Sequence, residues 1–428
     1  MSHLESLLAQ VDFLPLGERA ALLTRWADRL ARRQDDFARI ITAATGKPLR
    51  LARAEVERGL ATLRLTVAEA PRLQPREVDL GDAGRATIHR VPAGPVLAVT
   101  PFNFPLNLAL HKLAPALLAG CPVLWKPSPK APGVAEAAVA EFIAAGADGG
   151  ELVVAQLSDA QVRTLAADPR LAVLSFTGSA EVGRLLEAAT TRARVVLELG
   201  GNAAVILHQA TDRIAAARQI AFGACANAGQ SCISVQRIIT TGDDLDHAAW
   251  RDALTGAFSA VAAGDPWHER VVCGPLIDDA ARTRVQRELD GIRARGGRIL
   301  TGGTWLEGGR TLAPTLVEGL PASDPAVRDR ELFAPLAFML PARDLDHALV
   351  IADDTPFGLN AGLYTQDPAV IDTAFARLQI GTLVVNDVPT RRDDRLPYGG
   401  MKASGNGREG TLVALETYTV ERILWRAG

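Results

Sequence analysis

The stretch VLAVTPFNFPLNLALHKLAPALLAGCPVLWK, residues 96–126, decides the fold class. It opens with VLAVT, a continuous apolar run that predicts a strand buried on both faces. A helical pattern follows from about Leu108 to Ala119 and ends at Gly120, and the stretch closes on a second short apolar run, VLWK at 123–126. A strand, a helix and another buried strand in this order predict a parallel β-sheet covered by helices.

The same alternation extends along the chain in both directions. Residues 17–70 are expected to be helical with a break at Gly46-Lys-Pro, and further helices are expected at 134–144 and 280–295. An exposed strand is expected at 87–91, and buried strands at 153–156, 171–176, 195–199, 204–207, 235–239, 298–300, 337–340 and 382–385. The pattern predicts an α/β protein with a doubly wound parallel sheet, arranged as two interleaved lobes with a ligand cleft between them.

Composition excludes several classes of protein. The chain has 428 residues, too many for one ordinary core, and a net charge of −3, which argues against nucleic-acid binding. No apolar run approaches the ~18 residues of a membrane span, and Met1 to Leu16 lacks a signal-peptide pattern. The four cysteines show neither metal-ligand spacing nor a disulfide framework. We therefore expect a cytoplasmic protein with no bound metal and no membrane or nucleic-acid partner.

One cysteine stands among small residues. Cys232 lies in NAGQSCIS, residues 227–234, where small side chains permit close approach of a ligand. Residue type alone favours a buried structural cysteine. The Gly-Gln-x-Cys context, however, is similar to the nucleophile segment of aldehyde dehydrogenases.

Six further segments resemble that family, and all seven occur in the family's order. They are TPFNFP (100–105), WKPS (125–128), FTGSAEVG (176–183), LELGGN (197–202), ELFAPL (331–336) and PYGGMKASGNGRE (397–409). The resemblance implies the aldehyde dehydrogenase fold: a Rossmann-like cofactor domain (1–80 and 94–200), an α/β catalytic domain (201–400) and a small β oligomerisation flap (81–93 and 416–428). It also implies oxidation of a small-molecule aldehyde to a carboxylic acid with NAD or NADP, by a homodimer or homotetramer.

The resemblance assigns three catalytic residues. Cys232 would supply the thiolate that adds to the aldehyde, and Asn103 together with the Cys232 backbone N–H would stabilise the resulting oxyanion. Glu198, 34 residues before the cysteine, would activate the water that hydrolyses the thioester. On residue type alone, Asn103 is also compatible with a turn and Glu198 with a buried ion pair.

The resemblance also places the cofactor. Lys126 would reach a ribose, Glu331 would hold the nicotinamide ribose, and Phe333 would contact the ring. Backbone N–H groups at 178–183 would meet the pyrophosphate, although taken alone this segment is a helix-opening turn and Lys126 a surface lysine. The expected set is Thr100, Pro101, Phe102, Lys126, Ser128, Gly178, Ser179, Gly183, Leu199, Gly200, Glu331 and Phe333.

Two departures from the family accompany these matches. Position 129, where many NAD-preferring members carry Glu, is Pro129. Fewer residues than usual precede the first helix, so the resemblance does not predict the outer wall of the cofactor domain or some of the oligomer contacts.

The loop NDVPTRRDDRLPY, residues 386–398, is expected at the substrate entrance. This loop and the segment around Cys232 are similar to the branch acting on lactaldehyde and phosphonoacetaldehyde, which has an arginine at position 392. Arg391 and Arg392, with Asn107 and Ser231, are therefore candidates for binding a small polar or anionic aldehyde. The alternative is a surface loop whose arginines, Arg395 included, pair with Asp393 and Asp394.

Two other functions fit the same fold. A CoA-acylating dehydrogenase would cleave the thioester with a thiol, but such enzymes generally lack a functional carboxylate at position 198. An inactive homologue with a binding role would not be expected to keep Asn103, Glu198 and Cys232 together.

Overall fold

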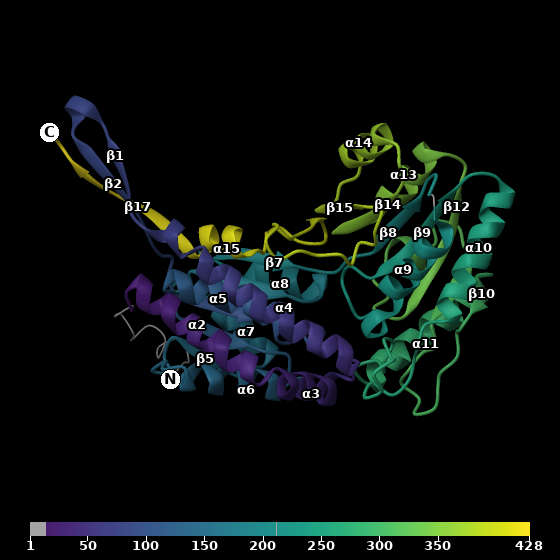
Figure 1. Cartoon of the computed structure of the whole chain (residues 1–428), viewed down its shortest axis with the longest axis horizontal. Coiled ribbons are helices and arrows are strands. Elements are labelled where there is room, and N and C mark those ends of the chain that lie inside the picture. The colour runs from purple at the N-terminus through teal and green to yellow at the C-terminus, as the bar shows by residue number, and fades with distance from the viewer. Residues whose placement is uncertain (1–13, 211) are drawn as a thin grey trace.

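The computed structural model describes residues 14–210 and 212–428, so the first 13 residues of the expected cofactor domain and the segment searched for a signal peptide lie largely outside it. One body contains a five-stranded, fully parallel sheet in the order β5-β4-β3-β6-β7 (Figure 1). Its strands are β3 (Val96–Val99), β4 (Val123–Lys126), β5 (Leu152–Val154), β6 (Val173–Thr177) and β7 (Arg194–Glu198). The order reverses between β3 and β6, which makes this the doubly wound sheet predicted from the sequence.

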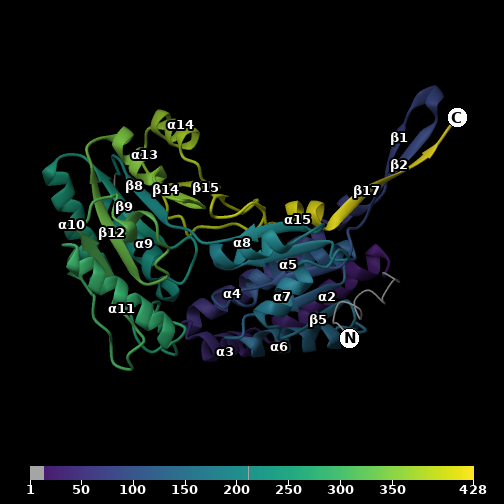
Figure 2. The same cartoon turned by 180° about the vertical axis from the view of Figure 1, so that it is seen from behind.

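Helices cover both faces of this sheet (Figures 1 and 2). Val96 and Ala98 of β3 belong to the core shared with α2–α6, whereas Leu97 and Val99 belong to the core shared with α7 and α8. Successive side chains of a strand point to opposite faces, so a strand buried on both faces needs an unbroken apolar run. These helices are α2 (Leu16–Arg32), α3 (Gln34–Thr45), α4 (Leu49–Ala68), α5 (Asn107–Ala119), α6 (Pro132–Ala144), α7 (Asp159–Ala166) and α8 (Ala180–Ala189).

The second body contains a seven-stranded sheet in the order β10-β11-β12-β9-β8-β14-β15, in which only the β10–β11 pair is antiparallel. Its strands are β8 (Ala203–Leu207), β9 (Val235–Thr241), β10 (Arg298–Thr301), β11 (Thr315–Glu318), β12 (Leu336–Ala342), β14 (Asn360–Tyr364) and β15 (Thr382–Val385). Its helices are α9 (Arg213–Cys225), α10 (Asp244–Ser259), α11 (Asp279–Ala294), α12 (Pro325–Arg328), α13 (Leu345–Asp353) and α14 (Pro368–Arg377).

A three-stranded antiparallel arm projects from the first body (Figure 1). It consists of β1 (Arg76–Asp79), β2 (Arg85–Pro92) and β17 (Thr419–Arg426), and α15 (Thr411–Tyr418) leads into it along α5. Residues 76–79, expected in the cofactor domain, therefore pair with β2 instead. The expected strands at 87–91 and near the C-terminus do form and pair with each other.

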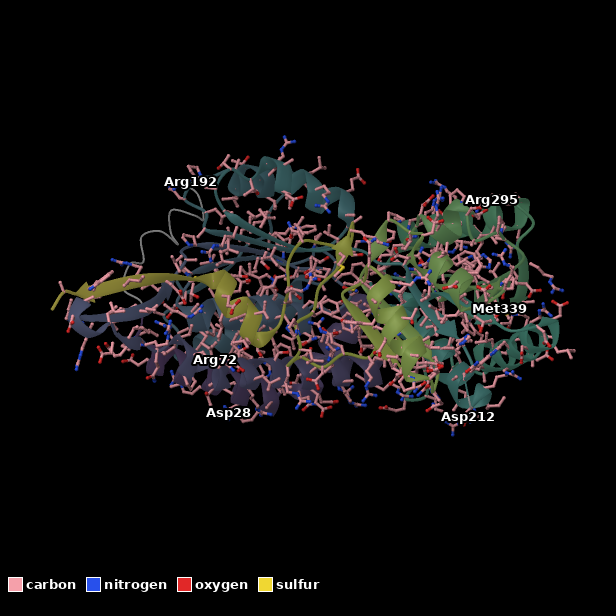
Figure 3. All side chains as sticks on the ribbon, turned by 90° about the horizontal axis from the view of Figure 1, so that it is seen from above. Asp28, Arg72, Arg192, Asp212, Arg295 and Met339 are labelled. Carbon is pink, nitrogen blue, oxygen red and sulfur yellow. The ribbon has the colours of Figure 1, made fainter. Side chains whose placement is uncertain are left out.

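The chain returns from the second body to the first between β15 and α15. Seen from above, this segment crosses the middle of the molecule between the two bodies (Figure 3). It includes β16 (Met401–Lys402), which pairs with β13 (Phe357–Gly358), and it lies against the end of β7. Within the described residues, no helix is long and apolar enough to cross a membrane.

Candidate active site

A cavity lies between the two bodies and brings the three predicted catalytic residues together. Asn103, Glu198 and Cys232 all line it, and so do the expected substrate residues Asn107, Ser231 and Arg392. Arg391 does not line this cavity. The other lining residues include Lys47, Glu55, Arg58, Phe104, Leu108, Thr177, Leu199, Phe222, Asn227, Ile233, Thr390, Tyr398 and Glu409.

Cys232 is held at the cavity by the backbone around it. The short 3-10 helix η3 (Ala226–Gly229) ends helix α9, and Asn227 and Ala228 within it adopt positive φ angles of 54° and 56°. The Cys232 carbonyl packs so closely on the β7–β8 turn that a Cβ at Gly201 would lie 2.1 Å from its oxygen. Only glycine fits at position 201, so the segments LELGGN and GQSC pack directly against each other at the cavity.

Among the described residues, the thiol of Cys232 has one hydrogen-bond partner. Its Sγ lies 3.1 Å from the Tyr398 hydroxyl. Burial of the thiol raises its pKa to about 12, while the hydrogen bond from Tyr398 acts in the opposite direction. The remaining cysteines, Cys121, Cys225 and Cys273, are buried, whereas Cys232 is partly exposed.

Glu198 ends strand β7 with its carboxyl group inside the cavity wall. It is 2% exposed, and neither carboxyl oxygen has a hydrogen-bond partner among the residues that the structure describes. Burial first, and then the nearby Glu409, raise its pKa well above the ordinary value. A buried carboxyl group without a cation bonded to it is not the ion pair considered as its alternative.

Asn103 follows strand β3 and faces the cysteine segment. Its side-chain amide donates a hydrogen bond to the Gln230 carbonyl at 3.0 Å, and its Oδ1 is buried without a partner among the described residues. Its own carbonyl accepts a bond from Asn227 at 3.3 Å. These contacts hold the amide beside Cys232, with a second N–H available to a ligand.

Most of the expected cofactor residues gather at one edge of the five-stranded sheet. Lys126 is the last residue of strand β4, and the others follow strands β3 (Thr100, Pro101, Phe102), β4 (Ser128), β6 (Gly178, Ser179, Gly183) and β7 (Leu199, Gly200). The carboxyl ends of parallel strands meet at a common edge, where nucleotides usually bind. Ser179 caps helix α8, so the positive end of that helix also points to this edge.

Glu331 and Phe333 reach the same region from the second body. The Glu331 carboxylate accepts a hydrogen bond from Gly201 N–H at 3.1 Å, and burial raises its pKa to about 7. A Cβ at Gly200 would lie 2.5 Å from that carboxylate. Phe333 packs edge-on against Phe102, with ring centroids 6.1 Å apart.

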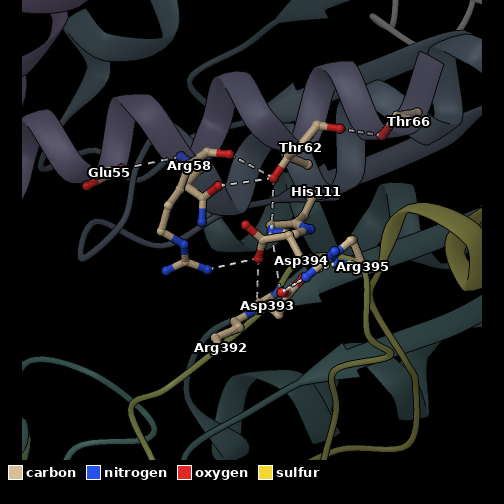
Figure 4. A network of polar contacts seen from close by, with 10 residues as sticks. Glu55, Arg58, Thr62, Thr66, His111, Arg392, Asp393, Asp394 and Arg395 are labelled. Carbon is tan, nitrogen blue, oxygen red and sulfur yellow. Dashed lines mark hydrogen bonds and ion pairs between the residues drawn. The ribbon is translucent and has the colours of Figure 1, made fainter. Parts of the chain in front are cut away.

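Arg58 and Arg392, which line the cavity, belong to a network of polar contacts around Asp394 (Figure 4). The Arg392 side chain is only 8% exposed and lies 3.3 Å from Asp394, which also binds Arg58 at 2.9 Å and His111 at 3.2 Å. The charge of the arginines and the bond from His111 lower the pKa of Asp394, and burial lowers that of His111. The network thus joins two guanidinium groups to one ionised carboxylate.

The neighbouring arginines behave differently. Arg391 is 73% exposed and pairs with Asp387 at 2.8 Å, while Arg395 pairs with Asp393. The loop turns the Arg391 side chain outward, so it lies outside this cavity, and its role in substrate binding stays a prediction. Arg395 pairs with Asp393 and Arg392 with Asp394, as the surface-loop alternative expects, although Arg392 is buried; Arg391 pairs with Asp387 instead.

Sequence reasoning missed several polar groups that line the cavity or bond to residues lining it. Tyr398 and Glu409 lie in the C-terminal signature, which bonds to the end of β7 through the Leu199 N–H and the Ser404 carbonyl at 2.9 Å. Glu409 forms a buried ion pair with Lys112. Arg58 lies on α4, in a helix with many charged residues, and no sequence signal separates it from them.

Comparison with known proteins agrees with this geometry. The aldehyde dehydrogenase family model matches residues 7–424. The 3-sulfolactaldehyde dehydrogenase of Priestia aryabhattai is 36% identical over 95% of this chain and 86% of its own length. The NADP-dependent succinate-semialdehyde dehydrogenase of Escherichia coli K12 is 34% identical over 95% of this chain and 84% of its own length.

Solved structures of related enzymes also superpose closely on this chain. The glyceraldehyde-3-phosphate dehydrogenase of Methanocaldococcus jannaschii, determined with NADP, superposes with a TM-score of 0.91 at 29% identity, covering 96% of this chain and 90% of that one. The chain belongs to the aldehyde dehydrogenase family and is an NAD(P)-dependent enzyme that oxidises an aldehyde to a carboxylic acid.

Proposed function

We propose that Cys232 is the nucleophile, Glu198 the general base and Asn103 the oxyanion donor of this enzyme. The observation that carries the proposal is their meeting in one cavity, although the segments that supply them are far apart in sequence. The Cys232 sulfur forms a bond to the aldehyde carbon, and the carbonyl oxygen takes up negative charge. An N–H of the Asn103 amide stabilises that charge, an interaction typically worth ~3–4 kcal/mol.

The second half of the reaction needs a base. Once the carbon has been oxidised to a thioester, water adds to it, the carbon–sulfur bond breaks and the carboxylic acid leaves. Glu198 accepts the proton of that water. Its raised pKa makes it a stronger base than an ordinary glutamate when it is ionised.

The edge of the five-stranded sheet fits a nicotinamide dinucleotide. The N-terminus of α8, which Ser179 caps, offers backbone N–H groups to phosphates, and the buried Glu331 carboxylate can accept hydrogen bonds from a ribose. The glycines at 178, 183 and 200 let Phe176, Leu199 and Glu331 pack closely at this edge. When bound there, the cofactor supplies the acceptor for the hydride. We assign the body around this sheet as the cofactor domain and the body around the seven-stranded sheet as the catalytic domain.

The substrate that fits the cavity is a short anionic aldehyde. Among the charged side chains that line the cavity or bond to those that do, Lys47, Arg58, Lys112 and Arg392 are cationic, and Glu55, Asp394 and Glu409 are their carboxylate partners. Lys47 and Lys112 each have a carboxylate of their own, whereas Arg58 and Arg392 share the single carboxylate of Asp394, so their wall has more cations than carboxylates. The three relatives described above are named for 3-sulfolactaldehyde, succinate semialdehyde and glyceraldehyde 3-phosphate. Each of these aldehydes carries an anionic group, which agrees with such a substrate.

Substitution of Arg392 tests the substrate class. Arg392→Ala should raise KM for a short anionic aldehyde such as succinate semialdehyde by about 10- to 100-fold, since a charged hydrogen-bonded pair contributes ~1.5–3 kcal/mol. KM for an uncharged aldehyde of equal length should change little. Arg391→Ala is the matched control, because it removes an adjacent arginine that points outward. The proposal would be contradicted if Arg392→Ala raised KM equally for both aldehydes, or if Arg391→Ala raised KM for the anionic aldehyde as much as Arg392→Ala does.

Assembly and location stay predictions. We propose that the three-stranded arm joins two copies of the chain into a dimer, or four into a tetramer, because its last strand exposes several large apolar side chains. The cytoplasmic location follows from the sequence expectation alone.

A further inference from the structure

We propose that Tyr398 is a fourth catalytic residue, whose hydroxyl donates a hydrogen bond to the Cys232 sulfur and stabilises it as a thiolate. The inference rests on the proposed role of Cys232 and adds a group that the family resemblance did not assign.

The position of the hydroxyl is fixed by the backbone and by packing. Tyr398 and Glu409 exchange two backbone hydrogen bonds of 2.7 and 2.6 Å, which tie both ends of the C-terminal signature together. The ring is buried and packs with Ile233 and Leu359. Among the described residues, the Cys232 sulfur is the one hydrogen-bond partner of the hydroxyl, at 3.1 Å.

Chemistry decides the direction of this bond. A thiol can donate or accept, but a thiolate can only accept, so the tyrosine must be the donor once the cysteine ionises. Burial raises the pKa of Tyr398 well above its ordinary value, so the hydroxyl keeps its proton near neutral pH. Burial disfavours the thiolate, and this donor, together with the charge of Arg392, offsets part of that cost.

Arg392 acts on the same tyrosine from the other side. Its guanidinium lies 3.8 Å from the ring centroid, which is a close cation–π contact. A cation over the ring withdraws electron density from the phenol and makes its hydroxyl a stronger donor. The arginine proposed to recognise the substrate anion and the nucleophile are therefore linked through one aromatic ring.

Alkylation kinetics test the proposal without requiring turnover. Iodoacetamide reacts with the thiolate form, and mass spectrometry can locate the product on Cys232. At pH values below the pKa of the thiol, Tyr398→Phe should be alkylated about ten-fold more slowly than the unmodified protein. The midpoint of its pH profile should move upward by about one unit. The value of kcat/KM should fall with it at neutral pH, with KM little changed.

Tyr364→Phe is the matched control. Its hydroxyl donates to Gln219 at 2.8 Å, and the residue does not line the cavity, so its alkylation profile should equal that of the unmodified protein. A Tyr398→Phe profile identical to that of the unmodified protein would overturn the proposal. If instead Cys232→Ala retained full activity, the proposed function itself would fail.

A second measurement avoids substitution at the site. The chain has three tyrosines, so uniform replacement by 3-fluorotyrosine in a Tyr364→Phe background alters few positions. Fluorination strengthens the phenol as a donor and should move the alkylation midpoint to lower pH. An unchanged midpoint in the folded, fluorinated protein would also overturn the proposal.

Discussion

At the scale of single residues, the Cys232 thiol and the Glu198 carboxyl both lie where the surrounding protein disfavours their charged forms. Each pKa is raised, chiefly by burial, and each group works in its deprotonated form. Deprotonation increases with pH, so kcat/KM should rise from about pH 6 to about pH 9 rather than reach a plateau at acid pH. Steady-state kinetics at saturating cofactor measure this profile. A rate that fell as pH rose through that range would contradict the assigned roles.

The nucleophile is tested by a pair of cysteine substitutions. Cys232→Ala should lower aldehyde oxidation by several orders of magnitude, since no other described side chain at the cavity can form a thioester. Cofactor binding, followed by fluorescence titration, should persist. Cys225→Ala is the control: Cys225 is fully buried in the core of the second body, so its loss should affect stability and leave the chemistry intact. Activity that depended on Cys225 rather than Cys232 would reverse the assignment.

The base is tested by separating the two half-reactions. Glu198→Gln should still form the thioester but hydrolyse it slowly, because the amide cannot accept the water proton. Rapid mixing should show one burst of reduced cofactor followed by little turnover, and mass spectrometry should find an acyl group on Cys232. Normal steady-state turnover would exclude Glu198 from the mechanism.

Single residues also show where sequence reasoning stops. Asn103, Glu198 and Cys232 are predictable because each sits in a short segment of distinctive composition. Arg391 and Arg392 are identical in type and adjacent, and only the loop conformation turns one outward and buries the other. Arg58 joins Arg392 through Asp394, 336 residues away in sequence, and no local pattern encodes such a contact.

At the scale of elements, the end of strand β4 bears on cofactor choice. Lys126 and Ser128 stand there, and Pro129 follows where a carboxylate would repel a 2′-phosphate. We therefore expect the enzyme to use both NAD and NADP, with NAD slightly preferred. Their specificity constants, measured with one aldehyde, should differ by less than about 10³-fold, roughly 4 kcal/mol. Pro129→Glu should lower kcat/KM for NADP more than for NAD. A native difference in kcat/KM above about 10³-fold, or a ratio of the two constants that Pro129→Glu leaves unchanged, would contradict this prediction.

Among the strands, several apolar runs are predicted correctly, but strands β11 and β14 are not predicted. Strands β3, β4 and β15 were placed within a residue of their bounds because buried parallel strands are continuous in apolar composition. Strand β14, NAGLY, contains Asn and Gly, and its burial comes from neighbours β8 and β15 on either side. The break between α2 and α3 at Arg33 was also missed, because neither Gly nor Pro marks it.

At the scale of the whole molecule, the two bodies meet at the cavity while the three-stranded arm points away from both (Figures 1 and 2). The outer edges of the arm are β1 and β17, and neither pairs with a further strand among the described residues. Ile423 and Trp425 lie on one face of β17 and are 65% and 60% exposed. Free edges and apolar side chains on a projecting sheet favour pairing with another chain.

The arm therefore predicts the assembly state. Sedimentation of the unmodified protein should give at least a dimer, and the double substitution Ile423→Asp and Trp425→Asp should shift it to a monomer, because charges on the apolar face oppose its burial. Leu245→Asp is the control, since Leu245 is 80% exposed on α10, in the second body and outside the arm. It adds the same charge at an exposed apolar position and should leave the assembly unchanged. A monomeric unmodified protein, or dissociation by Leu245→Asp alone, would show that the arm does not hold the copies together.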